Sequence, residues 1–345
     1  MDNIIKEIIE DIKVKSQDKG TYCDFGSDFY KPHSLDKRNF YEIFDAGETG
    51  RRIAFIDGGN NEIIASSDFS LHLIRIFEVV YENNLREKSH KYEFYCLASA
   101  SRQGDSIFYN VKTYPINYDF KVGSFDSFDK TLMTGLHRVS VSRICEAVRK
   151  LAEIDIASRL ADNFSSGDII VRDGDLMANA TYEIDFFNKL YAKAEEKEII
   201  ICGLSKTTLM FTETGWSLVS ALKSMAPDGA WYYYPLAENE NPLHPADIYT
   251  IKLDRKSKYC FKLEVYNKIE YDIRDVAGLL KLNSSDPVFL GYPYGLIVAD
   301  RFARVSNSEV EYIGMKLKTT AGKDWKEIEE SLHSIDAHGI LDNII

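Results

Sequence analysis

The stretch that decides the fold is RRIAFIDGGNN, residues 51–61, in which an apolar run ends at Asp57. Short apolar runs bounded by turn residues are typical of buried strands. The two glycines after Asp57 predict a turn there. We therefore expect residues 62–66 to return as the second strand of a hairpin, with Asp57 at the end of the first strand.

The segments that follow extend this hairpin into an antiparallel meander over residues 51–115. Residues 92–100 and 106–114 have the composition of strands and are joined by a polar turn at 102–105. Residues 71–81 fit either a strand or a helix. The region is therefore predicted to be mainly β-sheet and to carry Asp57 on its first strand.

A second decisive stretch, DIIVRDGD at residues 168–175, is an almost wholly apolar strand that ends in Asp173. Apolar residues at helical spacing predict a helix over 136–163 before it and another over about 180–197 after it. Residues 198–206 then form a further buried strand. Strand, helix and strand in this order predict parallel strands with right-handed crossovers.

Three acidic residues stand where these elements would bring them together: Asp57, Glu153 and Asp173. A meander, a helix and a parallel strand that carry such carboxylates are typical of an α/β ribonuclease-H-like fold, a mixed sheet flanked by helices. Divalent cations relieve the repulsion between clustered carboxylates, and two such ions can hydrolyse a phosphodiester. Glu146 and Asp155 on the same helix remain alternatives to Glu153.

Composition sets the class of protein. The chain has 345 residues, with 54 acidic and 42 basic side chains and a formal charge of −12, which argues against a uniformly basic surface but allows a local basic groove. Five widely spaced cysteines without a Cys-x-x-Cys pair indicate buried, reduced thiols. No apolar run is long enough to cross a membrane, so we expect a cytoplasmic protein without membrane contact.

The first helix, within residues 1–20, has one strongly apolar stripe. Two alternatives explain it: packing on the chain's own core, which we favour, or contact with a partner or a second subunit. The stripe consists of Ile4, Ile5, Ile8, Ile9 and Ile12.

Two later features have both a structural and a functional interpretation. The aromatic run at 231–235 favours packing of a core strand over stacking on unpaired bases. Arg301 and Arg304 recur at helical spacing after Gly295, and they fit either contacts to DNA phosphates or a solvated helix face. Residues 203–207 lack the first glycine of a P-loop, so nucleotide hydrolysis is expected to lie with a partner.

Five segments in order along nearly the whole chain give it a resemblance to the NurA nucleases, whose fold is similar to that of ribonuclease H. None of these motifs is specific by itself, but all five stand in the family's order. They are Phe55-Ile56-Asp57-Gly58-Gly59, Val171 to Leu176, Gly203 to Thr207, Gly291 to Arg301, and Asp336-Ala337-His338.

The resemblance implies a manganese-dependent nuclease, with Mg²⁺ as the alternative ion, that degrades DNA 5′ to 3′ and cuts single strands. It also implies a homodimer that works with a hexameric HerA-type translocase in DNA end resection and repair. Asp57, Glu153, Asp173 and His338 match the family's metal ligands. Lys206 matches a lysine that we interpret as a cation facing the phosphate.

The expected organisation is one NurA-type domain, residues 1–345, with the core at 51–210 and a C-terminal elaboration at 211–345 that completes the site. Asp175 stands where the family has a serine, so whether it joins the metal ligands remains open. The first hypothesis is a metal-dependent deoxyribonuclease. The alternative is a non-catalytic adaptor on the same fold that threads DNA and docks on a translocase.

Overall fold

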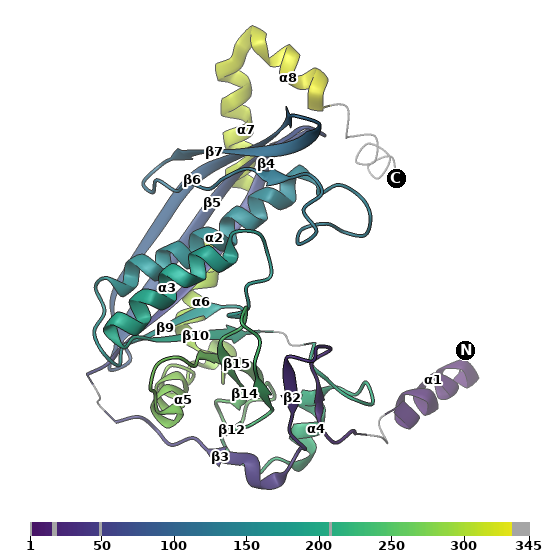
Figure 1. The fold of residues 1–345 in the computed structure, drawn as a ribbon, viewed down its shortest axis with the longest axis vertical. Helices are drawn as coiled ribbons and strands as arrows, with labels where there is room; N and C mark the ends of the chain where they lie inside the picture. Colours follow the sequence, from purple (N-terminus) through teal and green to yellow (C-terminus); the bar gives the residue numbers. More distant parts are fainter. Residues whose placement is uncertain (1, 16–18, 48–49, 207–208, 333–345) are drawn as a thin grey trace.

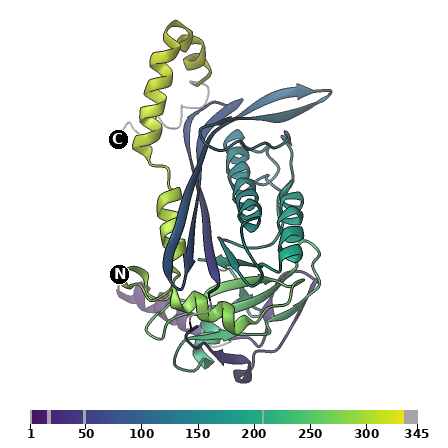
Figure 2. The same ribbon diagram turned by 90° about the vertical axis from the view of Figure 1, so that its left-hand side faces the viewer.

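A computed structural model describes residues 2–15, 19–47, 50–206 and 209–332 of the chain. Its centre is one long, twisted sheet with helices on both faces (Figures 1 and 2). Within the described residues the helices are α1 (Asp2–Lys15), α2 (Val141–Ala161), α3 (Glu183–Lys197), α4 (Leu218–Met225), α5 (Ile273–Leu282), α6 (Tyr294–Ala303), α7 (Asn307–Ala321) and α8 (Trp325–Leu332).

Eleven strands in the described part of the chain form the main sheet, and two pairs of short strands stand apart from it. Across the sheet the order is β3 (Phe40–Glu42), β12 (Trp231–Tyr233), β14 (Ala246–Lys252), β15 (Phe261–Tyr266), β10 (Ile200–Ser205), β9 (Ile169–Asp173), β4 (Arg52–Ala65), β5 (Phe69–Glu82), β6 (Leu85–Gln103), β7 (Ser106–Pro115) and β8 (Phe125–Asp126). The pairs are β1 (Cys23–Asp24) with β11 (Phe211–Thr212) and β2 (Tyr30–Pro32) with β13 (Ala237–Asn239).

The strands β4, β5 and β6 form the antiparallel meander that the sequence predicts, and the ambiguous segment 71–81 belongs to a strand. The expected turn after Asp57 is wrong. β4 continues through Gly58 and Gly59, which pair with Ile76 and Arg75 of β5. Pairing with a long neighbouring strand outweighs the turn preference of glycine, and the hairpin closes only after Ala65.

The second half of the core follows the predicted order of strand, helix and strand. β9 pairs in parallel with β4 on one side and with β10 on the other. The helices α2 and α3 cover one face of this sheet (Figure 2). Ile144, Val148 and Leu151 of α2 pack with Ile56 and Ile76 of the sheet in one buried cluster.

The opposite face is covered by α6, which lies directly on β4 (Figure 2). Two glycines allow this close approach. A Cβ atom on Gly295 would lie 1.9 Å from the ring of Phe55, and one on Gly59 would lie 2.3 Å from the carbonyl oxygen of Ala303. Neither contact is sterically possible, so only glycine fits at both positions. The last turns of α6 are therefore held next to the strand that carries Asp57.

Two expectations about the later segments meet different outcomes. The aromatic run at 231–235 supplies β12, whose Trp231 and Tyr233 are fully buried, so core packing is confirmed. Arg301 lies on α6, but Arg304 does not share that helix, because α6 ends at Ala303 and Arg304 has an extended backbone.

The first helix differs from the favoured expectation. The five isoleucines of its apolar stripe are 45–64% exposed, so the stripe does not pack on the core of the chain that the structure describes. All five cysteines are buried and free of disulfide bonds. Among the described helices, none combines the length and the apolar character that crossing a membrane requires.

A buried carboxyl on β5 gives a test of the fold. Burial raises the pKa of Glu78 to about 7, although a hydrogen bond from Tyr92 and the charge of Lys88 oppose the shift. Because the folded-state pKa lies above the unfolded value, the cost of ionising Glu78 grows as the pH rises from about 4.5 to 7. We expect Glu78→Gln to raise the free energy of unfolding by up to about 3 kcal/mol at pH 8.

The same substitution should have little effect at pH 4, where Glu78 is protonated in both states. Denaturant unfolding at pH 4 and pH 8 measures the difference, with the exposed Glu146→Gln as the control. A gain in stability that does not depend on pH would contradict this account of Glu78.

Candidate metal centre

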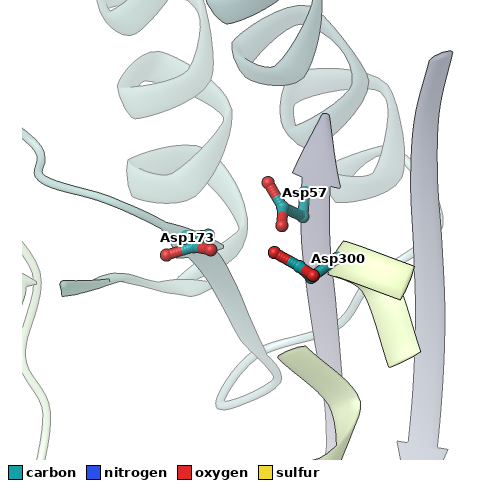
Figure 3. Close-up of side chains that lie close together, drawn as sticks. All are labelled: Asp57, Asp173 and Asp300. Atoms are coloured by element: carbon teal, nitrogen blue, oxygen red, sulfur yellow. The ribbon is translucent and has the colours of Figure 1, made fainter. Parts of the chain in front are cut away.

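Three aspartates from three separate elements converge beside the carboxyl end of β9 (Figure 3). Asp57 lies on β4, Asp173 ends β9, and Asp300 lies on α6. One carboxylate oxygen of each lies within 4.8 Å of the others. The parallel register pairs Ile56 with Arg172, so the two strand aspartates stand next to each other in the sheet. The meeting of the three aspartates therefore follows from strand pairing and from the packing of α6.

Lys206, the first residue after β10, places its ammonium group among these carboxylates. Its Nζ lies 2.5 Å from Asp173 Oδ2, 2.7 Å from Asp300 Oδ1 and 3.8 Å from Asp57 Oδ2. Burial alone would lower the pKa of Lys206, but the hydrogen bonds to Asp173 and Asp300 raise it above its usual range. The lysine therefore stays protonated and supplies the positive charge that the cluster needs.

Among these aspartates, Asp57 has the pKa that the surrounding charges and burial raise clearly. Burial raises the pKa of Asp57 to about 8, and the charges of Glu153 and Asp173 add to the rise, while Lys206 opposes it. A carboxylate held at this position without a compensating cation is unfavourable. The arrangement therefore favours the binding of positive charge.

Glu153 lies close to Asp57 but on the other face of the sheet. A Cβ atom on Gly58 would lie 2.5 Å from Glu153 Oε1, so Gly58 faces α2, whereas Gly59 faces α6. Glu153 forms ion pairs with Arg149 and, at 3.2 Å, with Arg172, and it is only 2% exposed. Glu153 thus neutralises two guanidinium groups and does not point into the cluster of aspartates.

Tyr292 completes the wall behind the aspartates. Its hydroxyl is buried and has no hydrogen-bond partner among the described residues. Burial raises the pKa of Tyr292 above its usual range, and the charges of Asp173, Asp57 and Asp300 raise it further. A buried phenol without a partner is unusual.

The loop that follows β9, residues 174–176, is held by contacts to the neighbouring strands β10 and β15. The backbone N–H of Leu176 donates to Glu264 at 2.6 Å. Glu264 is fully buried and pairs with Lys262 and His244 at 2.6 and 3.2 Å. Gly203 approaches the same loop so closely that a Cβ would lie 2.6 Å from the carbonyl oxygen of Gly174. These contacts hold Asp173 in place from the neighbouring strands.

A cavity of about 500 Å³ opens over the aspartates. It is lined by Asp57, Gly58, Gly59, Arg149, Asp173, Asp300 and Arg304. Two arginines thus face a cluster of carboxylates across a space that can admit a polar ligand.

The structure brings together some of the site residues predicted from the sequence. Asp57, Asp173 and Lys206 meet, and Glu153 lies beside them behind the sheet. His338 lies outside the described residues. Of the alternatives to Glu153, Glu146 is exposed and Asp155 binds Tyr118 and Arg159, so neither joins the cluster.

Asp300 is the residue that sequence reasoning missed. It lies within the Gly291 to Arg301 motif, but nothing in its spacing marks it as a partner of residues more than a hundred positions away. The usable signal was Gly295, because a glycine early in an apolar helix indicates close packing on another element. Asp175, the remaining alternative, lies outside the group of three and lines a neighbouring cavity.

Comparison with known proteins gives a structural match only. No protein-family model and no curated protein matches the sequence. The NurA nuclease from Sulfolobus solfataricus is similar in structure, with a TM-score of 0.53 and 13% identity over 94% of this chain and 95% of that one.

Weaker similarities extend to two other structures. Ciona intestinalis endonuclease V, solved with DNA, has a TM-score of 0.38 and 10% identity, over 76% of this chain and 87% of that one. An A. aeolicus Argonaute has a TM-score of 0.35 and 11% identity, over 74% of this chain and 28% of that one.

The match in fold agrees with the order of the elements. A meander of β4, β5 and β6 is followed by parallel β9 and β10, with α2 between the two halves. The predicted α/β ribonuclease-H-like architecture is thereby confirmed, and the chain has the fold of the NurA nuclease.

Proposed function

We propose that this protein is a metal-dependent nuclease that hydrolyses phosphodiester bonds of DNA. The observation that carries the proposal is the convergence of Asp57, Asp173 and Asp300 around one positive charge. The fold shared with a NurA nuclease supports the same activity. The finer features that the resemblance implies are 5′-to-3′ degradation, cutting of single strands and the setting of DNA repair, and they belong to this proposal.

The donor set fits a hard divalent cation. All three ligand groups are carboxylates, which suit Mg²⁺ and Mn²⁺. The ammonium group of Lys206 already occupies the space between them, and the raised pKa of Asp57 reflects a need for positive charge. When bound there, a divalent ion would lower the pKa of a water molecule and neutralise charge on the phosphate. We propose Mn²⁺ as the ion and Mg²⁺ as the alternative.

The ligands that we propose are Asp57, Asp173 and Asp300, with Glu153 and His338 as the two further candidates that the resemblance implies. For Glu153 to contribute, Arg149 or Arg172 would have to release it. The more direct role of Glu153 is to hold these two arginines in place, of which Arg149 lines the cavity over the aspartates.

The side chains of this chain also supply the positive charges that hydrolysis requires. Lys206 is positioned to face a phosphate above the aspartates and to stabilise negative charge that develops on its oxygens. Arg149 and Arg304 line the same cavity and can hold the neighbouring backbone.

The proposal extends to partners. We propose that the protein acts as a homodimer and works with a HerA-type hexameric translocase, as the resemblance implies. The exposed isoleucines of α1 support a protein partner, because a stripe of this kind costs free energy while it faces water.

The first test is loss of cleavage. Asp57→Asn and Asp300→Asn should each lower the rate of DNA cleavage at least about 100-fold, because even residues behind metal ligands cost about 10- to 100-fold when removed. End-labelled single- and double-stranded DNA with EDTA, Mg²⁺ or Mn²⁺ measures this. Asp105→Asn, in an exposed hairpin turn, is the matched control. Full activity of Asp300→Asn would remove Asp300 from the site.

The second test separates the role of Lys206 from that of the metal. Because its ammonium group competes for the same carboxylates, Lys206→Met should bind Mn²⁺ about tenfold more tightly. The same variant should cut DNA about 100-fold more slowly at saturating Mn²⁺, since it lacks a charge that faces the phosphate. Calorimetric titration and cleavage rates measure the two effects.

Lys281→Met, which removes a part-buried lysine that pairs with Asp45 away from the site, is the control for Lys206→Met. Weaker Mn²⁺ binding by Lys206→Met would show that the lysine supports the metal and does not compete with it.

The third test distinguishes Glu153 from the aspartates through stability. Glu153→Gln removes the ion-pair partner of the buried guanidinium of Arg172, so we expect it to lower the free energy of unfolding by about 3 kcal/mol. Asp57→Asn should instead stabilise the metal-free protein at pH 8, because it removes a buried charge next to other carboxylates. Denaturant unfolding in EDTA measures both, and equal destabilisation by the two variants would contradict the assignment.

A further inference from the structure

A second cavity, of about 450 Å³, opens beside the aspartates. It shares Arg149 and Asp173 with the cavity above the metal centre, and Lys206 also lines it. A ligand that reaches from one cavity into the other would therefore lie next to Asp173. The volume lies in the range of sites that hold a small molecule or one unit of a polymer.

Two cations on the α2 wall of this cavity lack acidic partners. Arg143 donates to the hydroxyl of Thr134. Within the described residues, no carboxylate lies within ion-pair distance of Arg143 or Lys150, although both line the cavity. Seven residues on a helix span two turns, so the two side chains leave the same face about 10 Å apart.

The acidic groups of the cavity are, by contrast, largely engaged. Glu153 is paired with Arg149 and Asp173 with Lys206. Glu183 is buried and accepts hydrogen bonds from the backbone N–H groups of residues 179 and 180 at 2.7 and 2.9 Å. Asp175 is the remaining carboxylate, and its charge acts on the buried Arg172. The cavity thus presents two uncommitted positive charges to a ligand.

We propose that this second cavity binds the nucleotide next to the phosphodiester bond that is cut, and that Arg143 and Lys150 bind the phosphate of that nucleotide. The inference rests on the proposed function, because it assumes that the aspartates lie at the site of cleavage. A phosphate group is the chemistry that fits, since charged hydrogen bonds from arginine and lysine to phosphate are the contacts that position a nucleic acid.

The experiment measures binding of a short, labelled oligothymidylate by fluorescence anisotropy in EDTA, where no metal-dependent cleavage occurs. Arg143→Gln combined with Lys150→Gln should weaken binding about tenfold. For a single strand each neutralised phosphate contributes about 0.7 to the salt dependence of log affinity, and the two side chains bind one phosphate, so the slope should fall by about 0.7. Combining Arg143→Lys with Lys150→Arg should retain both the affinity and the slope.

The matched control removes the same two charges elsewhere. Lys268 and Arg274 line a cavity at the start of β10, at the opposite end of the strands from the aspartates. The pair Lys268→Gln and Arg274→Gln should bind DNA as the wild type does. Equal weakening by both pairs would reduce the effect to net charge and overturn the assignment. Circular dichroism confirms that each variant is folded.

Two comparisons complete the test. If the loss of affinity occurs only with 5′-phosphorylated strands, the cavity holds a strand end, and equal loss with 5′-hydroxyl strands places an internal phosphate there. Unchanged binding and salt slope in the glutamine pair overturn the inference, whether or not the protein cuts DNA. Absence of cleavage with Mg²⁺ or Mn²⁺, together with weakened binding in that pair, would reject the nuclease and retain the phosphate site.

Discussion

The parallel pairing of β9 with β4 is the constraint on which the site depends. It places Asp173, at the end of β9, next to Asp57 in the middle of the sheet, where the charge of Asp173 raises the pKa of Asp57. The backbone hydrogen bonds of the sheet and the burial of its apolar faces hold the carboxylates together against their mutual repulsion. Bringing these carboxylates together lowers the stability of the fold, and the raised pKa of Asp57 reflects that loss.

The two faces of the sheet divide the charged groups into separate sets. Alternation along β4 and β9 sends Asp57 and Asp173 toward α6, and it sends Arg172 toward α2 and Glu153. Gly58 and Gly59 lack side chains, so the helices on the two faces approach the same strand closely. Only the backbone of β4 therefore lies between the aspartates on one face and the ion pairs of Glu153 on the other.

Much of the core and two of the three aspartates could be predicted from the sequence, because a short apolar run that ends in aspartate indicates a buried strand whatever its neighbours in the sheet are. The parallel unit from 136 to 206 and the positions of Asp57 and Asp173 follow from such local patterns. Asp300 could not be found in that way, since its place depends on how α6 packs across the chain. The turn predicted after Asp57 was wrong for a related reason: pairing with β5 is a long-range interaction that overrides the local preference of glycine.

The position of Lys206 connects the electrostatics to the chemistry. A lysine between carboxylates offsets part of their mutual repulsion. The divalent ion that we propose would compete with this charge, because both would interact with the oxygens of Asp173 and Asp300. A displaced ammonium group would still be held near by the end of β10, in the space that a phosphate would enter. In the nuclease that we propose, the lysine that pairs with these carboxylates would therefore also be suited to stabilise the charge that develops on the phosphate.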